Sequence, residues 1–202
     1  MTPTLDDLDR ALRAWADQHG IAVANRALGP ERSGAFDGPT VTINPIYDPE
    51  SQAFVLAHSL GSVVVWTLDQ ARSRTTYDAL RDAKRDRDGN RDQFEEALDA
   101  WAAHEEAASE YAVGMLAQVG HDWAVPAYTE FARADLDMML AFHRHGRGPV
   151  WRRFFPEWRQ RLARGEVVAR PYVPRPPPPD FRPVHRIPPQ EVFREEAGRP
   201  GD

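Results

Sequence analysis

The chain of 202 residues contains no cysteine and a single lysine, Lys84, beside 24 arginines. Without cysteine there can be no disulfide, no thiolate zinc site and no cysteine nucleophile. The unbroken apolar runs, such as Ala53 to Ala57 and Val63 to Trp66, are far too short to span a bilayer. Because the first ten residues are acidic and polar, no signal peptide is expected. We therefore expect a cytoplasmic protein that does not associate with membranes.

Positive charge is scarce over most of the chain and concentrated near its end. The net charge is -6, yet the segment from Arg144 to Arg186 holds eleven arginines and only three carboxylates. Such an asymmetry indicates either an anionic partner or a basic segment that folds back on an acidic body. We favour the second interpretation and consider nucleic-acid binding unlikely.

Apolar spacing, caps and breakers predict a helix-rich chain with a small sheet. Thr4 begins a capping pattern, and Gly20 ends the first helix. Short strands are expected at 21–23 and 41–43, joined by a glycine-rich connection. Further helices are expected from Asp48, ending near 72–76, then at 92–119, after Pro126 to Gly146, and at 150–163. A polar loop is expected near 82–92, and prolines from 171 to 189 impose an extended path.

The segment Ala-Phe-Val-Leu-Ala-His-Ser-Leu-Gly-Ser, residues 53–62, contains half of a zinc-binding helix motif. In His-Glu-x-x-His, residues i and i+4 share one helix face, so two imidazoles hold zinc while the Glu activates its water. His58 occupies the first position. Ser59 replaces the general base and Ser62 replaces the second histidine, so His58 alone cannot do this chemistry.

The order of parts resembles the ImmA/IrrE-type metallopeptidase family. The resemblance covers about residues 4–118 and includes the strand "TVTINP", the helix "QAFVLAHSLGS" and the later helix "EEAASEYAVGMLAQVG". Phe54, Ala57, His58 and Gly61 match the family's first helix, whereas Ser59 and Ser62 depart from it. Tyr111-Ala112 and Met115-Leu116 match the apolar part of the later helix, and that register places the family's third zinc ligand near Ala107.

The resemblance implies an α+β, mostly helical fold with a zincin-like core and a small sheet. We expect a degenerate zincin-like domain at 1–146, a basic aromatic helix packed on it at 147–170, and a proline-rich strap or tail at 171–202. The expected function is that of a catalytically inactive metallopeptidase-like protein, an interaction or regulatory module. Neither a metal nor another cofactor is expected. The expected partner is a protein or a second copy.

Glu105 is the one carboxylate on the inward stripe of the 92–119 helix, and His104 lies at the edge of that face. A buried carboxylate is costly unless it is paired or metal-bound. We expect Glu105 to pair with a buried Arg or with His58. The candidate cleft thus comprises His58, Ser59, Ser62, His104 and Glu105. A metal-dependent peptidase with the atypical ligands His58, His104 and Glu105 remains an alternative, although adjacent helical residues do not normally face one ion.

A second alternative is a serine hydrolase. Ala-His-Ser-Leu-Gly is similar to a nucleophile elbow, in which Ser59 would sit on a strained turn between strand and helix. That fold needs several parallel strands around the elbow, and residues 76–164 are expected to be helical. Four further histidines fall in expected loops or helix ends, where they should be solvated or capping: His121, His143, His145 and His185.

Overall fold

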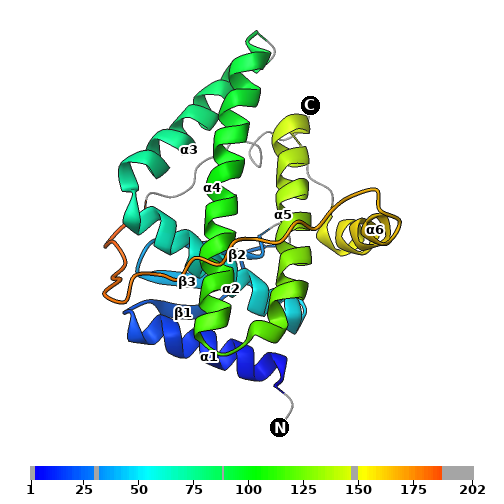
Figure 1. Cartoon of the computed structure of the whole chain (residues 1–202). Helices are drawn as coiled ribbons and strands as arrows, with labels where there is room; N and C mark the ends of the chain where they lie inside the picture. The colour runs from blue at the N-terminus through cyan, green and yellow to red at the C-terminus, as the bar shows by residue number, and fades with distance from the viewer. Residues whose placement is uncertain (1–2, 30–31, 88, 147–149, 188–202) are drawn as a thin grey trace.

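The computed structural model describes residues 3–29, 32–87, 89–146 and 150–187. Within these ranges the chain is mostly helical and carries one three-stranded sheet (Figure 1). The elements, in chain order, are α1 (Leu5–Gln18), β1 (Ala22–Asn25), β2 (Gly34–Phe36), β3 (Thr40–Ile43), α2 (Pro49–Leu68), α3 (Gln70–Arg85), α4 (Arg91–Gln118), the 3-10 helix η1 (Asp122–Ala124), α5 (Val125–His145) and α6 (Trp151–Ala163).

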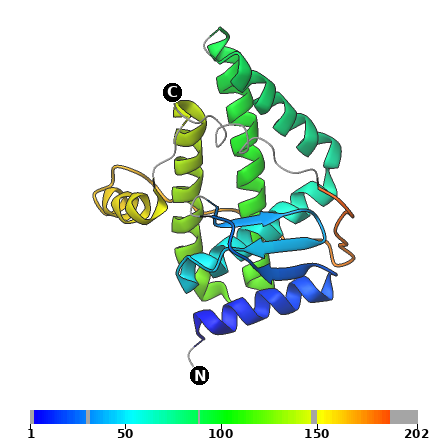
Figure 2. The same ribbon diagram turned by 180° about the vertical axis from the view of Figure 1, so that it is seen from behind.

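The sheet is mixed, with strand order β1-β3-β2. β1 pairs in parallel with β3, and β2 pairs antiparallel with it. Viewed from behind, the sheet lies in front of α2, and α1 runs along its β1 edge (Figure 2). β2 was not predicted, because it lies inside the connection that the sequence indicated only as glycine-rich. It is three residues long and half-buried throughout, so it lacks the alternation of buried and exposed residues that marks a strand.

α2 is the central helix of the core. Asp48 caps it through a hydrogen bond from the Ser51 amide, and Pro49 occupies the first turn. The helix is long and apolar enough to cross a membrane, but 72% of that window is buried inside the protein, as a core helix requires. The helix expected to start from Asp48 is confirmed, and it runs without interruption across residues 53–68.

α2 and α4 cross so closely that one glycine decides their separation. A Cβ atom on Gly61 would lie 2.1 Å from the carbonyl oxygen of Ala108. His58 and Glu105 each lie three residues earlier on their own helices, and their side chains meet. The glycine therefore permits the approach that brings these two polar residues into contact.

The expected helix break at 72–76 is wrong. The chain breaks at Asp69, whose backbone has φ -146° and whose side chain accepts a hydrogen bond from the Arg72 amide. That cap starts α3 at once, and α3 packs on α4 as the two arms of a long hairpin (Figure 1). The polar stretch that suggested a break forms the first turns of α3, where Ser73 is buried, and the helix continues inward with Tyr77 and Leu80.

α5 and α6 complete the helical layer. α5 ends at Gly146, whose φ of 72° is the left-handed conformation that glycine adopts without strain. α6 projects sideways from α5 (Figure 1) and is anchored by Trp158, which is 1% exposed and donates to Asp137 at 2.7 Å. On its outer side, Arg159 pairs with Glu130 of α5.

After α6 the chain returns across the body as residues 170–187, which we call the strap. It contains no helix or strand and passes in front of α5 and α4 (Figure 1). Phe181 stacks on Trp15 with ring centroids 6.1 Å apart, and the Ile187 amide donates to the Asp37 carbonyl at 2.7 Å. The expected tail from 188 to 202, with its apolar Val192 and Phe193, lies outside the described residues.

Gly61→Ala should destabilise the protein because the added methyl group meets backbone rather than a movable side chain. Forcing the helices apart should lower the free energy of unfolding by about 1–3 kcal/mol. Without that clash, alanine in place of a helical glycine would raise it by roughly 1 kcal/mol. Ala103→Gly, on the exposed face of α4, measures the difference in helix propensity between alanine and glycine in the same protein. Chemical denaturation of the two variants would contradict the account if Gly61→Ala proved stabilising.

Candidate functional site

A small polar pocket lies where α2, α4 and α5 meet. Its free volume is about 10 Å³, which is room for roughly one water molecule. Four polar side chains and four apolar ones line it: His58, Trp101, Glu105, Ser109, Ala132, Asp135, Leu136 and Met139. Burial of several ionisable groups around so small a space makes the pocket the principal candidate site within the described chain.

His58 and Glu105 form the centre of the site. His58 Nε2 lies 3.1 Å from Glu105 Oε2, and the two side chains are 21% and 15% exposed. This confirms the prediction that Glu105 is paired. The contact links the middle of α2 to the middle of α4 across the close crossing at Gly61.

The other carboxylate oxygen of Glu105 is also bound. Tyr77 of α3 donates its hydroxyl to Oε1 at 2.6 Å. Burial by itself would raise the pKa of Glu105, but the nearby His104 ring, whose Nδ1 lies 3.7 Å from Oε1, and the hydrogen-bonded His58 lower that pKa well below its ordinary value. Glu105 is therefore a carboxylate held by groups from three helices, and it stays charged at neutral pH.

The second ring nitrogen of His58 faces two hydroxyl groups. Ser109 Oγ and Tyr128 Oη each lie 3.4 Å from Nδ1. Burial acts to lower the pKa of His58, yet the hydrogen bond and charge of Glu105, helped by Asp135, outweigh it and raise that pKa. Protonation of His58 is thus favoured by the carboxylates on either side of it.

Asp135 is a site residue that the sequence analysis missed. It lines the pocket from α5, and burial followed by the charge of Glu105 raises its pKa to about 6, while His58 acts in the opposite direction. A signal existed in the sequence. Tyr128, Phe131 and Asp135 follow the i, i+3, i+7 spacing of one helix face, so Asp135 shares the inward face of α5.

The other candidate residues do not converge on the pocket. His104 turns toward α3, where its Nε2 lies 3.0 Å from Ser73 Oγ. The Ser62 hydroxyl donates to the backbone carbonyl of His58 at 3.1 Å. Ser59 is 5% exposed and packs beside Gly34 of β2. Of the five predicted residues, only His58 and Glu105 line the pocket.

The expectation of solvated histidines is wrong at two positions. His143 is completely buried, with its ring 4.7 Å from that of Trp101, and burial lowers its pKa to about 3. His121 is 8% exposed and accepts a hydrogen bond from the Trp123 indole. The reason at His143 is that the inward face of α5 continues into its last turn. His145 is exposed as expected.

The geometry restricts what the site can do chemically. Across residues 3–29, 32–87, 89–146 and 150–187, no three His, Cys, Asp or Glu side chains are grouped to hold a metal ion. Ser59 lies inside α2, and no residue other than glycine has a positive φ in the same ranges, so the strained elbow is absent.

Ser109, His58 and Glu105 do follow one another as hydroxyl, imidazole and carboxylate. However, Ser109 is 2% exposed and donates its hydroxyl to the Glu105 carbonyl at 3.2 Å. It also lies within α4, where backbone N–H groups are used by the helix and cannot stabilise an oxyanion. The three residues therefore form a structural network and not a nucleophilic triad.

No protein-family model matches the sequence, and neither the curated proteins nor the solved structures that were compared gave a significant match.

Replacing Glu105 should separate hydrogen bonding from simple space filling. Glu105→Leu leaves the Tyr77 hydroxyl and the His58 ring without their partner, at a cost of about 1–3 kcal/mol for each unpaired group. Glu105→Gln keeps one acceptor and one donor, so its loss should be smaller. Glu106→Gln is the matched control, because Glu106 is the next residue of α4, its side chain is 44% exposed and it forms a surface pair with Arg133. Equal and negligible changes in the free energy of unfolding for both Glu105 variants would contradict the buried network.

Asp135→Asn should change stability in a pH-dependent way. The pKa of Asp135 is raised in the folded state. Its contribution to the free energy of unfolding is therefore fully present below its unfolded-state pKa of 3.8 and is lost as pH rises through its folded-state pKa of about 6. The Asn variant cannot ionise, so its Tm should exceed the wild-type Tm at pH 7.5 and the difference should shrink at pH 4. Asp99→Asn, an exposed change on α4, controls for the loss of one charge. A gain that is the same at both pH values would contradict a buried, charge-sensitive Asp135.

Proposed function

We propose that the chain is a metallopeptidase-like protein without hydrolytic activity that acts as an interaction or regulatory module. One observation carries this proposal. His58 Nε2, the nitrogen that faces the partner helix, is engaged by the Glu105 carboxylate at 3.1 Å. In a zinc helix of the resembling family, an imidazole at this position would bind metal through a free lone pair.

The arrangement of elements supports descent from a zincin-like scaffold. A small mixed sheet precedes α2, α2 carries His58 at its middle, and α4 returns a glutamate to the same point. This is the order of parts that the resemblance to the ImmA/IrrE-type family implies. The proposed core therefore keeps the contact between the two helices, while His58 is the one metal-binding residue of the family motif that remains at its matching position.

The serines at the two remaining motif positions support the loss of chemistry. Ser59 cannot replace a general base, and its hydroxyl lies against β2 rather than in the pocket. Ser62 is 3% exposed and bonded within its own helix. A positioned general base contributes about 10²- to 10⁴-fold to rate, so its absence removes a large part of any hydrolysis.

The interaction role is supported by features outside the pocket. α6 projects from the body with exposed Arg153 and Arg161, and the strap adds an extended proline-rich surface. Several basic residues here already contact the acidic body, as Arg159 does with Glu130. We therefore propose a protein partner or a second copy, in the cytoplasm, rather than nucleic acid or a membrane.

Metal content and proteolysis test this proposal together. Full-length protein purified without a histidine tag should contain far less than one zinc per chain, and neither added zinc nor a chelator should shift its Tm. It should also leave a peptide library intact with zinc present. His58→Ala and an active zinc peptidase are the controls. Stoichiometric zinc, or zinc-dependent cleavage that disappears in His58→Ala, would overturn the proposal.

A further inference from the structure

The strap places one aromatic side chain against the candidate pocket. Tyr172 is 6% exposed and lies beneath Arg133 of α5, whose guanidinium is 3.9 Å from the ring centroid. Burial raises its pKa to about 12, and Arg133, Ser109 and Asp135 are close enough to modulate that value. Two of these neighbours, Ser109 and Asp135, line the pocket. Tyr172 is therefore buried against Arg133 of α5, near two residues of the pocket, without lining the pocket itself.

Arg133 contacts the beginning of the strap in two ways and is itself paired with α4. Its ring-facing guanidinium stacks on Tyr172, its Nε donates to the Arg170 carbonyl at 3.0 Å, and its Nη1 pairs with Glu106 of α4. The stacked guanidinium and the bound carbonyl fix one backbone position and one side-chain position of an extended chain. This is how a protein recognises a short peptide.

The next residues of the strap lie along α4 and form a hydrogen bond with its backbone. The Arg175 amide donates to the Glu110 carbonyl at 3.0 Å, and the Arg175 side chain lies 3.6 Å from the Glu110 carboxylate. Gly114 gives the strap room, because a Cβ atom there would lie 2.2 Å from the Arg175 carbonyl oxygen. Pro177 is then buried.

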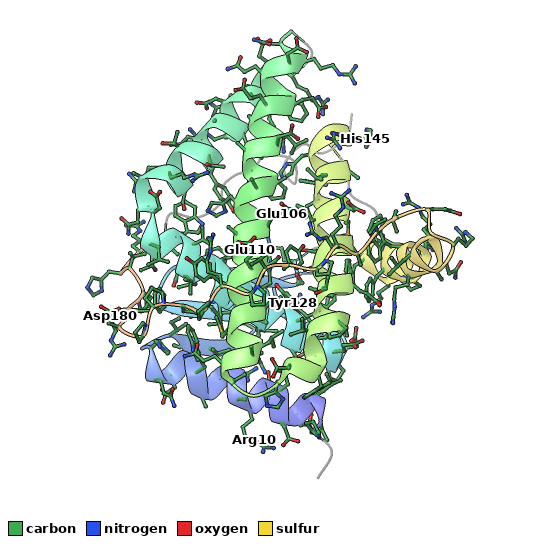
Figure 3. The ribbon with its side chains drawn as sticks, viewed as in Figure 1. Arg10, Glu106, Glu110, Tyr128, His145 and Asp180 are labelled. Carbon is green, nitrogen blue, oxygen red and sulfur yellow. The ribbon has the colours of Figure 1, made fainter. Side chains whose placement is uncertain are left out.

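The charges of the two surfaces are complementary. Glu106 and Glu110 lie on α4 near the crossing strap (Figure 3). The strap brings the Arg175 side chain to Glu110. We use the term groove for the receiving surface formed by Glu106, Glu110, Gly114, Arg133 and Asp135.

The resident tyrosine fills the groove imperfectly. Its hydroxyl is buried and makes no hydrogen bond within the described part of the chain. A buried hydroxyl without a partner weakens docking. Beside it, Val173 is 71% exposed, and the prolines of this stretch donate no backbone hydrogen bond. A partner segment that places a tyrosine on Arg133 and gives its hydroxyl a hydrogen-bond partner would therefore bind better than the strap, apart from the advantage of covalent attachment.

We propose that the groove between α4 and α5 recognises an extended, basic, proline-rich segment of a protein partner that carries a tyrosine, and that residues 170–177 are its resident occupant. The prolines fix φ in advance, so such a segment loses little conformational freedom on binding. This inference rests on the proposed role as an interaction module, whose partner it specifies.

A labelled peptide with the sequence of residues 168–178, Val-Ala-Arg-Pro-Tyr-Val-Pro-Arg-Pro-Pro-Pro, tests the groove in the full chain. Tyr172→Ala vacates the aromatic position without altering the groove. This variant should bind the peptide at least tenfold more tightly than the unaltered chain in fluorescence anisotropy. A control peptide with Ala in place of Tyr should lose at least tenfold. Adding Gly114→Ala to the variant should abolish binding, because it obstructs the peptide backbone.

A folded Tyr172→Ala protein that does not bind the peptide, or binds the Ala control equally well, would overturn the inference. If this variant does not fold, Arg175→Ala in the full chain replaces it, because this side chain is 52% exposed. It should bind the peptide at least threefold more tightly than the unaltered chain, and no gain would count against the groove. Dimers of the unaltered chain that disappear in Tyr172→Ala would overturn the assignment to a different protein and identify a second copy as the occupant.

The same peptide distinguishes this inference from the proposed function. Peptide that is bound and remains intact supports both. Peptide that is bound and cleaved would overturn the absence of hydrolysis while supporting the groove. A chain that neither binds nor cleaves the peptide would remove the groove alone, since the zinc and cleavage results above are independent of it.

Discussion

The contact between His58 and Glu105 is the interaction on which the centre of this protein depends. Two largely buried side chains, an imidazole and a carboxylate, meet between α2 and α4, and their contact offsets part of the desolvation cost of each. Gly61 makes their approach possible, and Tyr77 and Tyr128 provide further partners from α3 and α5. Four helices are thereby joined at one point. Removing either side chain would leave the other buried without its hydrogen-bond partner.

Much of this centre could be predicted from the sequence. The inward stripe of α4 placed Glu105 toward the core, and the apolar pattern with Asp48 and Pro49 gave α2 and the position of His58. Asp135 could also have been found from the spacing of α5. Other parts depend on contacts distant in sequence. β2 is stabilised by β3 and by Val55 against Gly34, and the orientation of His104 is set by Ser73.

The strap and the pocket belong to one description of function. The pocket between the helices has a free volume of about 10 Å³, and the groove beside it receives a basic, proline-rich segment of the same chain. Under the proposed function, helices that position a metal in the resembling family position a peptide here, and the contact between His58 and Glu105 stabilises the surface that receives it.

The state of the His58 ring tests the central claim most directly. Nitrogen-15 NMR of labelled histidine reports which ring nitrogen carries the proton and at what pH the ring titrates. The account predicts that neutral His58 carries its proton on Nε2, donating to Glu105, and that its pKa lies above the ordinary value of 6.5 and falls in Glu105→Gln. A proton on Nδ1 with an unprotonated Nε2, and a titration that Glu105→Gln does not change, would contradict it.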